Sequence, residues 1–95
     1  MLSARATVET DKADRYMRAL CNHFGRKVTA GYEGNHGTVQ FGFGNCEFDA
    51  QDHALNILVQ VEDDENLARI KDVVGGHLER FAASAEALTV EWINE

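Results

Sequence analysis

The fold is decided by residues 27–62, which read KVTAGYEGNHGTVQFGFGNCEFDAQDHALNILVQVE. Apolar and polar residues alternate there in four short runs, and a period of two is typical of a β-strand with one buried face. Residues 34–37, 44–45 and 51–53 are rich in glycine, asparagine and aspartate, which favour turns. Because these connections are short, we expect the four strands to pair antiparallel in sequence order.

One strand and one helix precede these runs. Residues 3–9 alternate as a short strand. Thr10 or Asp11 then offers an N-cap for a helix that carries an apolar stripe and ends near Phe24, with Gly25 as a C-terminal stop.

A second helix and a last strand follow. Carboxylates at residues 63–65 favour a helix N-terminus, and an apolar stripe continues to Phe81. Gly75 and Gly76 lie inside this helix, where each costs about 1 kcal/mol relative to alanine. Either the helix kinks there or another backbone packs closely against it. Residues 88–93 then alternate as a terminal strand.

This order predicts a single α+β domain over residues 1–95. Two helices cover only one face of such a sheet, so we expect a two-layer sandwich with a mainly antiparallel sheet. The open face is predicted to carry Arg5, Thr7, Thr38, Gln40, Glu47, Asp49, Asn56, Leu58, Gln60, Glu91 and Ile93. This set is mostly polar, so the face can meet water. Leu58 and Ile93 are the exceptions, and they allow a homodimer through this face.

Composition excludes several classes of function. The chain has 95 residues, of which 44% are hydrophobic and 26% charged, as in an ordinary soluble domain. Its net charge of −7 opposes binding to nucleic acid or to an anionic membrane surface. No apolar run is long enough to span a bilayer, and residues 1–5 lack the apolar region of a signal peptide. We therefore expect a cytoplasmic protein with two reduced cysteines.

The first helix has a mildly basic side. Its cations are Lys12, Arg15, Arg18, Arg26 and Lys27. A solvated outer face explains such a pattern without any ligand. If the protein binds an anion, the side of the helix bearing Arg15 and Arg18 is the predicted binding site.

Four residues are candidate ligands for a transition metal: Cys21, His23, Cys46 and His77. Cys21 and His23 are two positions apart on a helix and point to different sides, so they cannot hold one ion alone. Cys21, Cys46 and His77 would bind zinc or iron if they met beneath the helices. The alternative is that the cysteines are small core residues and that the protein needs no cofactor.

Asp49, Asp52 and His53 form the one compact cluster of acids and imidazole. A general base needs an orienting acid within reach and a pocket that excludes water. A turn on a small antiparallel sheet promises neither, so solvated side chains are the alternative. A small hydrolase or isomerase would use these three residues.

Five segments, in this order, resemble the small bacterial domain-of-unknown-function family 2218. They are Leu20–Phe24, His36–Phe41, Phe43–Glu47, His77–Ala82 and Leu88–Trp92. Similar domains occur joined to siderophore-interacting flavoproteins. The resemblance therefore implies an accessory role in handling iron or ferric siderophores, with a partner such as a flavoprotein reductase.

The sequence departs from the family pattern at Gly75-Gly76, where helix-forming residues are expected, and at Gly42, where proline is expected. The resemblance supplies no catalytic residues. We therefore expect a non-enzymatic binding or accessory domain, with a metal-binding protein and a small hydrolase or isomerase as alternatives.

Overall fold

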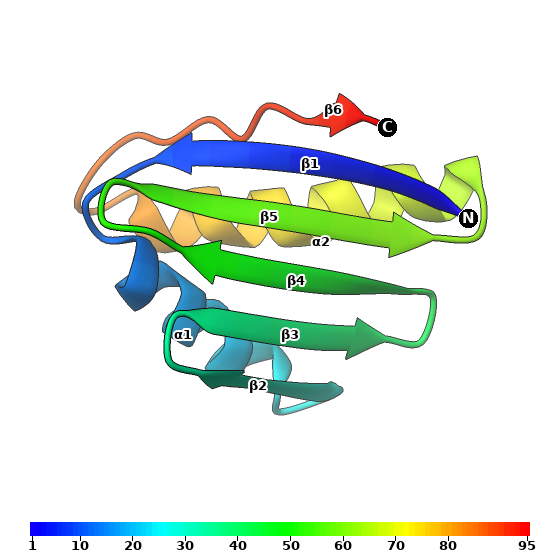
Figure 1. Cartoon of the computed structure of the whole chain (residues 1–95), viewed down its shortest axis with the longest axis horizontal. Coiled ribbons are helices and arrows are strands. Elements are labelled where there is room, and N and C mark those ends of the chain that lie inside the picture. Colours follow the sequence, from blue (N-terminus) through cyan, green and yellow to red (C-terminus); the bar gives the residue numbers. More distant parts are fainter.

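The structure, a computed structural model, describes residues 1–95 as two layers (Figure 1). The strands are β1 (Leu2–Glu9), β2 (Thr29–Glu33), β3 (His36–Phe41), β4 (Gly44–Ala50), β5 (Ala54–Val61) and β6 (Ile93–Asn94), and the helices are α1 (Ala13–Phe24) and α2 (Asp64–Ala82). Both helices lie behind the sheet in Figure 1. The predicted α+β sandwich, with two helices on one face, is confirmed.

The sheet has the strand order β2-β3-β4-β5-β1-β6, and all neighbouring strands are antiparallel. The four middle strands are adjacent in sequence order, as their short turns predict. β2 and β3 are joined by Gly34-Asn35, and Gly34 adopts a φ of 61°, which a side chain would disfavour. β1 pairs with β5 along its whole length, so the first strand closes the sheet beside the last long strand.

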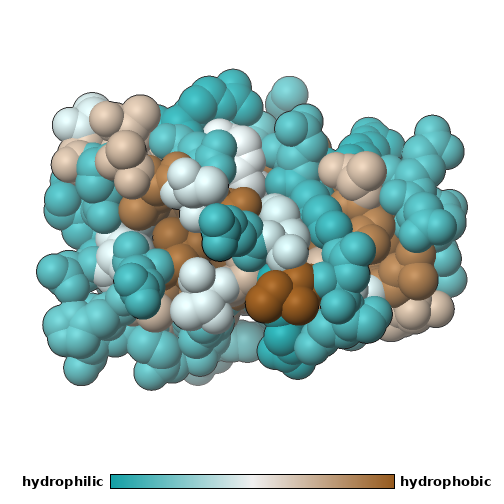
Figure 2. Space-filling model, turned by 90° about the horizontal axis from the view of Figure 1, so that it is seen from above, coloured by the Kyte–Doolittle hydropathy of each residue, from teal (hydrophilic) through white to brown (hydrophobic).

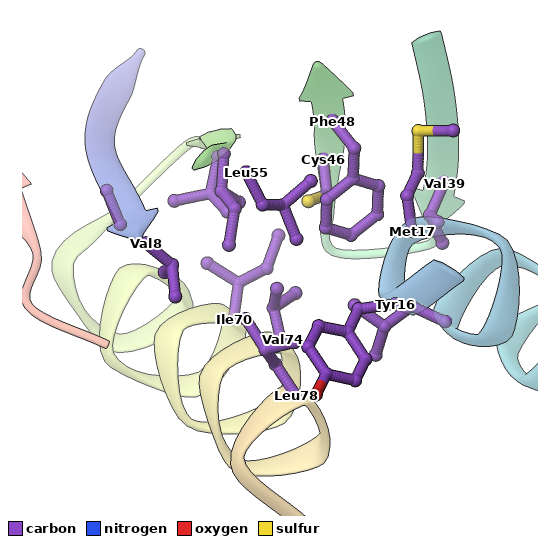
Figure 3. Close-up of a cluster of buried hydrophobic side chains, with 14 of the residues drawn as sticks. Val8, Tyr16, Met17, Val39, Cys46, Phe48, Leu55, Ile70, Val74 and Leu78 are labelled. Carbon is purple, nitrogen blue, oxygen red and sulfur yellow. The ribbon is translucent and has the colours of Figure 1, made fainter. Parts of the chain in front are cut away.

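The core lies between the sheet and the helices and contains 23 buried residues. Figure 3 shows how strand and helix side chains meet there. The labelled residues from the strands are Val8, Val39, Cys46, Phe48 and Leu55, and those from the helices are Tyr16, Met17, Ile70, Val74 and Leu78. Each large apolar side chain that is fully buried here contributes about 1.5–3 kcal/mol of transfer free energy.

The β3–β4 turn differs from the prediction. It consists of residues 42–43 rather than 44–45, and Phe41 pairs with Gly44. In this register Gly37 lies opposite Phe48. A Cβ on Gly37 would lie 2.9 Å from Cys21 Sγ of α1, and one on Gly44 would lie 2.5 Å from Val61 Cγ1 of β5. The observed register therefore places both strand glycines where a side chain would clash with a close neighbour.

The terminal strand is shorter than predicted. Only Ile93–Asn94 pairs with β1, and the predicted outward residue Glu91 lies outside the sheet. The preceding residues turn instead toward α2, where Val90 N donates to Glu79 Oε2 at 3.0 Å. Figure 2 looks down on the β1–β6 edge and shows apolar areas among the polar surface.

The segment that leaves the sheet edge packs over Gly75 of α2. A Cβ on Gly75 would lie 3.4 Å from Trp92 Nε1 and 3.5 Å from Val90 Cβ, which are ordinary van der Waals contacts. The helix continues through Gly75-Gly76 without a break. Neither predicted alternative holds, because the helix is continuous and the neighbours of Gly75 are side chains rather than backbone.

The helix starts differ in their capping. Asp63 caps α2, because its Oδ1 accepts a hydrogen bond from Asn66 N at 2.9 Å. The predicted cap of α1 is wrong: Lys12 occupies the N-cap position and its side chain makes no capping bond. Thr10 Oγ1 accepts from Lys12 N at 3.1 Å, just before the helix.

Neither helix combines the length and apolar character needed to cross a lipid bilayer.

Gly44→Ala should destabilise the protein. The new Cβ would lie 2.5 Å from Val61 Cγ1 and 2.8 Å from Gln60 O, and the backbone oxygen cannot yield. Overpacking of this kind costs about 1–3 kcal/mol. Thermal unfolding should show a decrease in Tm of about 4–8 °C for each kcal/mol.

The matched control is Gly31→Ala, whose Cβ would meet nothing within 4 Å. Its Tm should stay within a few degrees of the wild type. Equal losses of Tm in both variants would show that close packing at Gly44 is not the cause.

Candidate functional site

The two predicted cysteine ligands are core residues. Cys21 and Cys46 are both buried free thiols. Burial raises the pKa of the Cys21 thiol to about 11. Burial also raises the pKa of Cys46 well above its ordinary value, with a smaller contribution from the nearby Cys21. Without a metal, both thiols therefore stay protonated at neutral pH.

The two predicted histidine ligands lie outside the core, where α1 meets α2. The ring centroids of His23 and His77 are 4.9 Å apart. Nδ1 of His77 donates to the carbonyl oxygen of Val73 at 2.6 Å, which leaves Nε2 free. The four predicted ligands thus form a cysteine pair and a histidine pair. No three His, Cys, Asp or Glu side chains converge in a way that could hold a metal ion.

In the acid and imidazole cluster at the β4–β5 turn, His53 is hydrogen-bonded to Asp11 and not to Asp49 or Asp52. His53 Nδ1 lies 2.7 Å from Asp11 Oδ1, and both side chains are about 85% exposed. The hydrogen bond to Asp11 is the main reason that the pKa of His53 is raised. Asp49 instead accepts from Gln51 Nε2 at 2.6 Å. The predicted residues therefore do not form an enclosed acid–base site.

A cationic surface lies where α1 and the turn that follows it meet the C-terminal part of α2. We call it the basic groove and define it by Lys12, Arg15, Ala19, His23, Arg26, Lys27, His77, Arg80 and Phe81. At one end lies a hollow of about 170 Å³ that Lys12, Arg15 and Phe81 help to line. Phe81 links this hollow to the other end, because its ring centroid lies 5.4 Å from that of His23.

The groove gathers positive charge on an acidic chain. Its five lysine and arginine side chains contrast with the net charge of −7 of the whole protein. The carboxylate that contacts it is Glu86, which lies 4.0 Å from Lys12 Nζ. Glu86 is also bound by the hydroxyls of Tyr16 at 2.8 Å and Thr10 at 2.9 Å. Most of the cationic charge of the groove is therefore free to attract an anion from solution.

The surroundings of His23, including these cations, lower its pKa. Partial burial against neighbouring rings lowers the pKa of His23, and the positive charges of His77, Arg26, Lys27 and Arg80 lower it further. The positive charges near His23 also repel a metal dication. The electrostatics of the histidine pair thus suit an anionic ligand better than a metal.

The two predicted anion-binding arginines are separated by the structure. Arg15 lines the hollow and makes no salt bridge or side-chain hydrogen bond. Arg18 points to the other side of α1, where its Nε lies 3.0 Å from Asp14 Oδ2 and its guanidinium stacks over Tyr32 of β2. Arg15 therefore belongs to the basic groove, and Arg18 does not.

The open face of the sheet carries a second hollow, of about 280 Å³. Several of its polar side chains are already partnered within the chain. Arg5 Nε lies 2.7 Å from Glu95 Oε2, and Thr7 Oγ1 donates to Asn56 Oδ1 at 2.9 Å. These partners reduce what the face can offer a ligand. The homodimer through this face stays a prediction.

Sequence reasoning missed Arg80 and Phe81, which α2 brings to the groove. Part of the signal was present on α1, because Arg15 and Ala19 are four positions apart and share one side of the helix. Arg26 follows the end of α1 and is not placed by this periodicity. No local pattern indicates that this side faces the end of α2. Only the packing of the two helices on the sheet brings the two sets together.

The fold and the groove define a small α+β domain with an anion-attracting surface between two helices. Residues 5–93 match the DUF2218 family, described as uncharacterized proteins conserved in bacteria, and the chain belongs to this family. The NMR structure of PA4090 from Pseudomonas aeruginosa is similar, with a TM-score of 0.82 and 32% sequence identity over 98% of this chain and 96% of that chain. No curated protein matches the sequence. The predicted family is confirmed, and membership assigns no activity.

The titration of His23 tests the charge of the groove. Replacing a nearby cation, as in Arg80→Gln, should raise the pKa of His23 toward its ordinary value, measured from the ring proton shifts by NMR. Because the folded state binds this proton less readily than the unfolded chain, His23 should lower the unfolding free energy as the pH falls below about 6.5.

The control is Arg69→Gln. Arg69 stacks over Phe43, with 3.9 Å between its guanidinium and the ring centroid, and does not affect His23. Equal changes in the pKa of His23 in both variants would contradict a local effect of the groove cations.

Proposed function

We propose that this protein is a non-enzymatic cytoplasmic binding domain that holds an anionic ligand in the basic groove. The observation that carries the proposal is the gathering of five cations, with one carboxylate in contact, on a chain of net charge −7. An acidic protein repels anions at long range, and screening limits such forces to about 8 Å at physiological salt. Binding therefore depends on direct contact with the groove.

The groove also offers rings beside its charges. The His23 centroid lies 4.9 Å from that of His77 and 5.4 Å from that of Phe81. Rings that are at least partly exposed beside guanidinium groups suit a ligand with both planar and anionic parts, since rings stack and arginine donates to oxygen anions. A metal ion alone offers neither feature.

The family resemblance suggests the biological setting. Domains similar to this one occur joined to siderophore-interacting flavoproteins, and many ferric siderophores carry net negative charge. We therefore propose an accessory role in iron–siderophore handling, in which the groove receives the ferric siderophore. The acidic surface of a flavoprotein reductase is the alternative occupant of the same groove.

A panel of ferric siderophores should reveal binding by thermal shift. A ligand present at about 100 times its Kd adds about 2.7 kcal/mol of stability, which for a domain of this size corresponds to roughly 10–20 °C in Tm. Arg26→Glu should abolish most of this shift, because it reverses a charge on the groove. Arg18→Glu makes the same change in net charge outside the groove and should keep it.

Two further arms of this experiment separate the alternatives. Zinc and iron salts alone test the predicted Cys/His site: a shift that Cys46→Ser removes would favour a metal-binding protein. Titration with a purified flavoprotein reductase, followed by sedimentation, tests the protein partner. If no siderophore shifts Tm, or if Arg18→Glu and Arg26→Glu lose the shift equally, the groove is not the ligand site.

A further inference from the structure

The hollow at the Arg15 end of the basic groove has the size of a single aromatic ring. It measures about 170 Å³ and lies between α1 and the chain that follows α2. A cavity of about 150 Å³ lined by apolar side chains is known to hold benzene. A fused two-ring system would need more space than this hollow has.

The walls of the hollow suit an aromatic ring. Phe81 forms one side and is half-buried, so one part of its ring is free to contact a ligand. Ala19 from α1 and Ala85 from the chain after α2 are small apolar residues that leave the space open. Tyr16 adds a buried ring, and its hydroxyl is already used by Glu86. Offset or edge contacts between rings are favourable in such a setting.

The rim of the hollow suits a carboxylate. Arg15 is exposed there and has no partner within the chain. Its planar guanidinium can bind both oxygens of a carboxylate at once, which a lysine cannot do. Lys12 lies on the same rim, 4.0 Å from Glu86, and adds positive charge.

We propose that the basic groove binds a single-ring aromatic acid, with the ring in the hollow and the carboxylate on Arg15. This inference rests on the proposed anion-binding function and names the chemical class of its ligand. An aliphatic acid would satisfy Arg15 but leave the hollow unfilled. The aromatic acid is either a free metabolite or an arm of a larger iron chelator that carries a free aryl carboxylate, since both present the same ring and anion.

The test is a titration of the ¹⁵N-labelled protein with benzoate, propionate and 2-naphthoate, followed by NMR. Benzoate should bind at least about tenfold more tightly than propionate, and it should shift the amide signals of Ala19, Ser84 and Ala85. 2-Naphthoate should bind more weakly than benzoate, because the hollow is too small for two rings. Adding a ferric siderophore that carries a free aryl carboxylate to the benzoate complex distinguishes the sources: displacement assigns the hollow to an arm of the chelator, and retention assigns it to the free acid.

Two pairs of variants locate the site. Arg15→Gln should weaken benzoate binding about tenfold, as expected for loss of a hydrogen bond to a charged group, whereas Arg18→Gln should not. Ala19→Leu should fill the hollow and abolish benzoate binding, whereas Ala68→Leu, at an exposed position of α2, should not.

The possible negative results separate failure of the aromatic-acid proposal from failure of the proposed anion-binding function. Equal affinity for propionate and benzoate would overturn the aromatic class while leaving an anion-binding groove. Binding of a ferric siderophore without any binding of benzoate would also overturn the aromatic class and leave the anion-binding groove. The absence of binding to every anion tested would overturn the proposed function as well.

Discussion

The close approach of the helices to the sheet is the constraint on which the rest of this structure depends. A Cβ on Gly37 of β3 would lie 2.9 Å from Cys21 Sγ and 3.2 Å from Met17 Cγ, so α1 reaches the sheet only over a glycine. A Cβ on Gly44 would lie 3.2 Å from Ile70 Cδ1, which limits α2 in the same way. Because both helices are held against one sheet, their facing sides are brought together and the basic groove exists.

The distribution of charge follows from this arrangement. The carboxylates at the start of α2 stabilise its N-terminus, and Asp63 also caps it. The cations of α1 that face α2 have few acidic neighbours, and Arg80 joins them from the last turn of α2. The result is a local positive surface on an acidic domain, which contains the exposed ring of His23 and the half-buried ring of Phe81. Such a surface favours contact with small anions without making the whole protein attractive to polyanions.

Much of the fold could be predicted from local patterns, and the exceptions have identifiable causes. The alternation in residues 27–62 predicted four antiparallel strands because each strand buries one face. The turn at residues 42–43 was missed, since the register depends on Gly37 and Gly44 lying where side chains of the helices and of β5 pack closely. The terminal strand was overestimated because the alternation of its residues does not show that Trp92 packs over Gly75 instead of extending the sheet.

The order of the elements, the layer arrangement and the acidic balance of the chain were readable in the amino-acid sequence, because periodicity, turn chemistry and charge are local properties. Arg15 was also identified there as a candidate for anion binding. The separation of Arg15 from Arg18, the burial of Cys21 with Cys46 and the meeting of His23 with Phe81 could be seen only in the folded molecule. These relations join residues from different elements, and the packing of helices on the sheet, rather than any local pattern, sets which of their sides face one another.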